Sequence, residues 1–132
     1  MFLHELSTDA KKSFYKLAYT VMNSDNKATK EELKVLKLYE KEMGLTIDFD
    51  LDNTIEDELK VINTLESSEK KKIYFELMTL AYSDHEYAEE EKDLLSMIGN
   101  HIKVSPNDQD TLRQCAENLT QTYKTLSVTF NS

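Results

Sequence analysis

The sequence predicts an all-α single domain, and its composition is the first reason. The 132 residues include only 2 Gly and 1 Pro, too few for the turns of a β-sandwich. Hydrophobic residues make up 39%, which is enough for a core and argues against disorder. With 16 basic and 25 acidic residues the formal net charge is −9, which argues against nucleic acid as a partner. We therefore expect one small acidic helical bundle over residues 1–132.

Three helices are expected in the first half of the chain, because apolar residues recur there at helical spacing. The first covers residues 9–23. The second begins at Thr29, which can form a capping box with Glu32, and it ends at Gly44, a residue suited to a left-handed C-terminal turn. A short third helix over 54–65 has acidic residues in its first turn, where they favour the helix dipole.

Three more helices are expected in the second half. Residues 67–82 are apolar on most sides, which is typical of a central helix. A fifth helix covers about 88–102. Ser105 followed by Pro106 is a typical N-terminus for the sixth, which covers about 107–128.

The apolar stripe of the sixth helix includes Cys115 and Tyr123. We interpret Cys115 as core packing and Tyr123 as an aromatic residue at the edge of the core. The tail 128–132 contains β-branched residues, and we expect it to fray.

The chain also repeats itself: a shift of 59 residues lays 11–45 over 70–104 without a gap. We infer two pseudo-symmetric helix–turn–helix units, joined by the acidic stretch and short helix of 46–66. Nine aligned pairs are identical: Lys11/Lys70, Lys12/Lys71, Tyr15/Tyr74, Thr20/Thr79, Ser24/Ser83, Asp25/Asp84, Glu31/Glu90, Glu32/Glu91 and Leu36/Leu95.

Each unit has one acid in its interhelix turn and another seven residues later, namely Asp25 with Glu32 and Asp84 with Glu91. If the units pack about a pseudo-two-fold axis, the four carboxylates converge, and together they need protons or a cation. Calcium and magnesium take oxygen ligands of this kind. The alternative is structural, because Glu32 is explained by the capping box and the two Asp residues by turn hydrogen bonds.

These residues resemble the TerB-like family of tellurite-resistance-associated helical domains, whose motif is an Asp-Gly turn followed by a Glu that opens the next helix, often in two copies. The matches here are 23–26 with 31–32, and 81–85 with 90–91. Asn26 and His85 stand where the family has glycine. The resemblance covers about residues 9–130. It implies a helical fold, a divalent-cation site (calcium or magnesium) at those acids, and a non-enzymatic role in bacterial stress or phage-defence complexes.

A second acidic stretch resembles the first half of an EF-hand calcium loop. Asp48, Asp50 and Asp52 have the required spacing, but Asn53 and Leu59 stand where the loop needs glycine and a bidentate glutamate. We therefore interpret this stretch as a solvated linker.

The alternative function is that of an acidic inhibitor or immunity-type protein, which would bind a basic partner protein. The segment 84–93 contains six acids and one lysine, and we expect Glu86, Tyr87, Glu90 and Asp93 to contact the partner. No spacing typical of a nucleophile and its base, or of a zinc protease, is present, so we expect no enzyme. Because no signal peptide or membrane-spanning run is found, we expect a cytoplasmic protein without membrane insertion.

Overall fold

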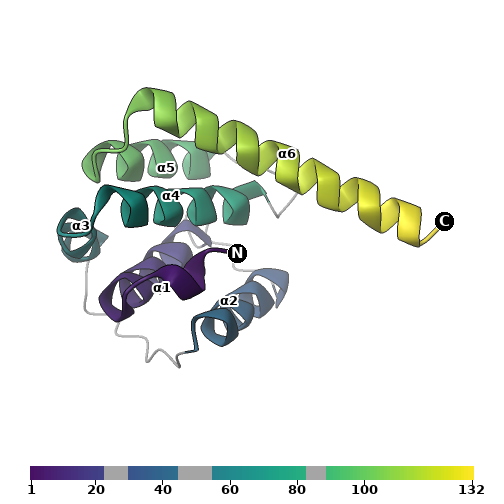
Figure 1. The fold of residues 1–132 in the computed structure, drawn as a ribbon, viewed down its shortest axis with the longest axis horizontal. Helices are drawn as coiled ribbons and strands as arrows, with labels where there is room; N and C mark the ends of the chain where they lie inside the picture. Colours follow the sequence, from purple (N-terminus) through teal and green to yellow (C-terminus); the bar gives the residue numbers. More distant parts are fainter. Residues whose placement is uncertain (23–29, 45–54, 83–88) are drawn as a thin grey trace.

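A computed structural model of the chain describes residues 1–22, 30–44, 55–82 and 89–132, and the side chains of 22, 30–33 and 89–91 are not described within those ranges (Figure 1). All regular structure in this part of the chain is helical, which confirms the predicted all-α class. A short 3-10 helix, η1 (Leu3–Glu5), precedes six α-helices: α1 (Thr8–Met22), α2 (Lys30–Met43), α3 (Ile55–Asn63), α4 (Ser67–Tyr82), α5 (Glu89–His101) and α6 (Pro106–Phe130).

Helix α4 lies at the centre of the bundle, as its mostly apolar sequence predicts (Figure 1). It contacts α1, α5, α6 and η1. Ile73 and Leu77 are fully buried, and even the carboxylate-bearing Glu76 is only 3% exposed. The core of the protein is therefore built around this helix.

Two predicted helix ends are confirmed in detail, the C-terminus of α2 and the N-terminus of α6. Gly44 ends α2 with a φ of 69°, a value that glycine adopts without strain. The Ser105 hydroxyl accepts the Asp108 backbone N–H at 3.1 Å, directly before Pro106 in the first turn of α6. The expected capping box is not described, because Thr29 lies outside the described residues and the side chain of Glu32 is not described.

The first six residues were not predicted to form structure, yet they belong to the core. Leu3 and Leu6 are buried, and η1 contacts α2 and α4. A second unexpected feature is Glu58 of α3, which is buried and pairs with Lys16 of α1 at 3.2 Å. The burial of this carboxylate is compatible with folding because a charged partner accompanies it.

Helix α6 differs most from its prediction. It reaches Phe130, so the expected fraying from residue 128 is wrong, and its C-terminal half extends beyond the other helices (Figure 1). Cys115 is exposed and Tyr123 is 58% exposed, so their placement in or at the core is wrong as well. For Tyr123 the physical reason is length: α4 has 16 residues and α6 has 25, so α6 continues where α4 no longer covers it. Cys115 lies level with α4, but it is about 100° around α6 from the buried Ala116 and so points away from the core.

Candidate functional site

A mostly apolar concave surface lies along α6. It consists of two adjoining hollows of about 430 and 670 Å³, which share Met1, Phe75 and Leu119. We call them together the α6 groove. Volumes of this size suit a ligand or a few inserted side chains.

The two hollows differ in the helices that form them. The smaller hollow opens between α2, α4 and the C-terminal half of α6, and its apolar lining includes Val35, Tyr39, Leu80 and Tyr123. The larger hollow lies between the N-terminal segment, α4 and the first half of α6, with Phe2, Leu112 and Cys115 in its lining. The groove therefore follows α6 along much of its length.

A charged group lies buried at the floor of the groove. The Glu76 carboxylate accepts the Phe2 backbone N–H at 2.7 Å and the Met1 amino group at 3.0 Å. Burial lowers the pKa of this amino group, but the hydrogen bonds and charges of Glu42 and Glu76 outweigh it, and the pKa is raised overall. These bonds fasten the N-terminal segment across α4 and so build one wall of the groove.

The C-terminal half of α6 carries almost no charge. Residues 118–132 contain one charged side chain, Lys124, in a protein with 31% charged residues. The hydroxyls of Thr122, Thr125 and Thr129 donate to the carbonyls of the residues four positions before them, at 2.8, 3.0 and 2.8 Å. These hydroxyls are therefore satisfied within the helix, and their burial against a partner would leave no donor unpaired.

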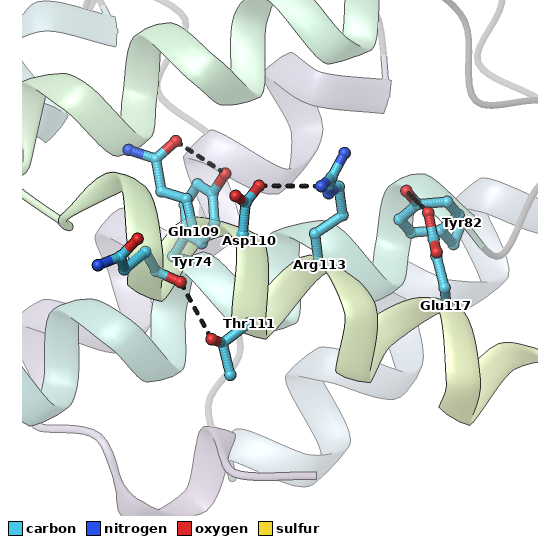
Figure 2. Close-up of polar contacts among 8 residues, drawn as sticks. Tyr74, Tyr82, Gln109, Asp110, Thr111, Arg113 and Glu117 are labelled. Atoms are coloured by element: carbon cyan, nitrogen blue, oxygen red, sulfur yellow. Dashed lines mark hydrogen bonds and ion pairs between the residues drawn. The ribbon is translucent and has the colours of Figure 1, made fainter.

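A second, polar contact lies between the first half of α6 and α4 (Figure 2). Tyr82 of α4 donates to Glu117 of α6 at 2.6 Å, and Tyr74 donates to Gln109 at 3.4 Å. Burial raises the pKa of Tyr74, and the nearby charge of Arg113 offsets only part of that rise. A hollow of about 470 Å³ opens here. These polar pairs hold the first half of α6 against α4, together with the packing of the buried Ala116.

The expected cation site falls on residues that the structure does not place. Asp25 and Asp84 lie outside the described residues, whereas Glu32 and Glu91 belong to α2 and α5 without described side chains. Asp48, Asp50 and Asp52 also lie outside. Among the side chains that are described, no three from His, Cys, Asp and Glu are placed to share a metal ion. The cation site therefore stays a prediction.

The expected partner-binding residues are described only in part. Asp93 is exposed on α5. Glu86 and Tyr87 lie outside the described residues, and Glu90 belongs to α5 without a described side chain. The acidic surface for a basic partner stays a prediction too.

The α6 groove was not predicted from the sequence, although a signal for it exists. Apolar or small residues follow one another on α6 in steps of 4, 3, 4, 3 and 4 positions, which is the spacing of a coiled-coil seam. They are Leu112, Ala116, Leu119, Tyr123, Leu126 and Phe130. Together with the loss of charge after residue 117, this stripe indicates a helix face that continues beyond the core.

Fold and groove together define an all-α bundle with an apolar groove beside a projecting helix. Comparisons of the chain with protein-family models, with curated proteins and with solved structures find no match. The resemblance to TerB-like domains therefore stays a prediction from the residues. None of the helices that the structure describes is long and apolar enough to cross a membrane.

Proposed function

We propose that this protein is a non-enzymatic binding module of the TerB-like kind, which holds an amphipathic helix of a protein partner in the α6 groove. The observation that carries the proposal is the groove itself. Phe75, Leu80 and Leu119 line it, and the half of α6 with almost no charge continues from it. An apolar groove that continues onto an exposed apolar helix is typical of a surface that binds a partner.

The shape of the groove favours a helix as its occupant. Its two hollows succeed one another along α6, so an occupant can contact it over several turns. Amphipathic helices bind such grooves by placing apolar side chains at i, i+3, i+4 and i+7 into successive hollows. An extended strand has no sheet edge to pair with in the described structure, which is entirely helical.

Site-specific photo-crosslinking tests this function. Tyr123 lines the groove, whereas Val128 is 70% exposed, lies about 140° around α6 from Tyr123 and lines neither hollow, so it serves as the matched control. We expect benzoylphenylalanine at position 123, in cells of the source organism, to form covalent adducts with a helical segment of a protein. The same group at position 128 should form none. Equal adducts at the two positions, or none at position 123, would contradict the proposal.

The repeat supports an additional cation-binding role. We propose that Asp25, Glu32, Asp84 and Glu91 bind calcium or magnesium, as the resemblance implies. Matched positions of the two units share the same burial: Leu36 and Leu95 are both buried, and Leu38 and Met97 are both exposed. This agreement supports a pseudo-symmetric arrangement that would bring the acids together.

Calorimetric titration with calcium and magnesium tests the cation role. Binding should raise the midpoint of thermal unfolding, and Asp25→Asn with Asp84→Asn should abolish that rise. Asp48→Ala with Asp50→Ala is the matched control and should leave it unchanged. Absence of heat and of stabilisation at millimolar ion would exclude the site.

An acidic inhibitor of a basic partner protein remains the alternative function. The exposed carboxylate of Asp93, next to the acidic sequence 84–91, is the described feature that favours it. Such binding should weaken steeply as salt increases. A pull-down that recovers a basic protein at low salt, and loses it with Glu86→Lys and Asp93→Lys, would support this alternative.

A further inference from the structure

The apolar stripe of α6 is half covered and half exposed. Ala116 is buried, and Leu112 and Leu119 pack against the core. The stripe then continues without a break to Leu126 and Phe130, which are 41% and 78% exposed. Since the spacing does not change between the two halves, the exposed half has the same capacity to pack against a helix as the covered half.

Charge favours a second copy of this chain as the occupant of the exposed half. Two molecules with a net charge of −9 each repel one another over most of their surface. The stretch 118–132 contains no acidic residue, and its single charged side chain, Lys124, is positive. It is therefore a segment through which two copies can approach without repulsion between acidic side chains.

The same face also contains both halves of a self-complementary contact. Phe130 is an exposed apolar side chain. The smaller hollow, about 430 Å³ in volume, is lined by Leu80, Leu119 and Tyr123 and has room for an apolar side chain. A two-fold interface needs these two features on one surface, because each copy must offer what the other accepts. When Phe130 of one copy meets the hollow beside positions 119–123 of the other, the two-fold axis falls near Leu126.

We propose that two copies of this chain dimerise through antiparallel pairing of the C-terminal halves of α6, so that each copy inserts Phe130 into the α6 groove of the other. The proposal rests on the proposed function, since it names the helix that the groove binds. Leu126 of each copy faces its counterpart across the two-fold axis. The threonine hydroxyls at positions 122, 125 and 129 enter the interface already paired.

Sedimentation equilibrium over a micromolar to millimolar concentration series tests the dimer. The wild-type mass should approach twice 15.4 kDa. Phe130→Glu should weaken the dimer by about tenfold or more, because it removes a buried aromatic contact and adds a charge. Val128→Glu, about 160° around the same helix from Phe130, is the matched control and should dimerise like the wild type. Both positions are exposed in the single chain, so neither change should alter its circular dichroism.

Disulfide crosslinking tests the antiparallel register. In a Cys115→Ser background, Leu126→Cys should form a dimer-sized disulfide product under mild oxidation, and Val128→Cys should form much less.

A wild type that stays monomeric throughout the sedimentation series would overturn the proposal, and so would a dimer that survives Phe130→Glu. If the protein is monomeric but position 123 crosslinks to another protein, the self-association fails while the proposed binding function stands. If position 123 forms no adduct at all, both the dimer and the proposed binding function are contradicted.

Discussion

Gly99 of α5 lies directly against Tyr74 of α4 and Gln109 of α6. A Cβ atom at this position would lie 2.8 Å from Cε2 of Tyr74 and 2.9 Å from Cδ of Gln109. Gln109 cannot move away without cost, because its amide donates to Asn100 Oδ1 at 3.0 Å and to the Val104 carbonyl at 2.8 Å. The three helices can therefore pack this closely only because Gly99 has no side chain.

Gly99→Ala should lower the free energy of unfolding by about 1–3 kcal/mol, because the new methyl group overpacks a filled contact. Urea denaturation measures the change. Ser96→Ala, at an exposed position on the same helix, is the control and should change stability by less than about 0.5 kcal/mol. If Gly99→Ala were as stable as the wild type, the close approach of Tyr74 would be refuted.

The ionisation of Tyr15 makes the stability of the fold depend on pH in the alkaline range. Burial, followed by the hydrogen bond to Glu40 and the charge of that residue, raises the pKa of Tyr15 from 10.0 to about 12. Its hydroxyl donates to Glu40 Oε1 at 2.7 Å. The folded protein therefore retains this proton at pH values where the unfolded chain has already lost it.

The sign of the pH effect follows from linkage. The contribution of Tyr15 is fully present below pH 10 and is lost as the pH rises through its folded-state pKa of about 12. Denaturation at a series of alkaline pH values should show the free energy of unfolding falling across this window. Tyr15→Phe should make the fall shallower. An unchanged slope in the variant would show that Tyr15 is not responsible.

At the scale of single helices, the N-terminus of α6 shows how directly sequence can determine an element. Ser105 and Pro106 predicted the start of the helix, and the hydroxyl of Ser105 accepts the Asp108 N–H as a cap does. Ser105→Ala should lower the free energy of unfolding by about 1 kcal/mol. Ser105→Asp retains an acceptor and should restore most of the loss, which thermal unfolding can measure. Equal destabilisation by both variants would exclude the cap as the cause.

The helices were predictable because their spacing and caps are local properties of the chain. The exposure of Tyr123 was not, because it depends on where a neighbouring helix ends. Helix α4 has 16 residues and α6 has 25, lengths of roughly 24 and 37 Å. The same stripe is therefore core in its first half and surface in its second.

The candidate site was likewise predictable only in part from the sequence. The 59-residue repeat singles out Asp25, Glu32, Asp84 and Glu91, but a repeat cannot specify the distance between two turns. The α6 groove escaped prediction because Val35, Phe75 and Leu119, which line it, come from three helices far apart in the sequence. Only the apolar stripe and the low charge of α6 can be recognised in the sequence itself.

At the scale of the whole molecule, the net charge of −9 makes self-association depend on salt. Raising NaCl from about 0.05 to about 0.5 M shortens the range of repulsion between two like-charged copies. The α6 contact is apolar, so added salt weakens its attraction little. The dissociation constant of the dimer should therefore fall several-fold, as sedimentation equilibrium would measure. A dimer that weakens with salt would indicate an ionic interface instead.

The spacing of the stripe on α6 also determines how a second helix can follow it. The five steps of 4, 3, 4, 3 and 4 residues cover 18 residues, which is 3.6 residues per step and therefore the period of a straight α-helix. The stripe therefore runs along one side of α6, with Phe130 in line with Leu112. A second helix whose side-chain ridges fit the grooves along this stripe crosses α6 at about 20°. Two antiparallel copies would then place their bundles at opposite ends of a slowly twisting rod.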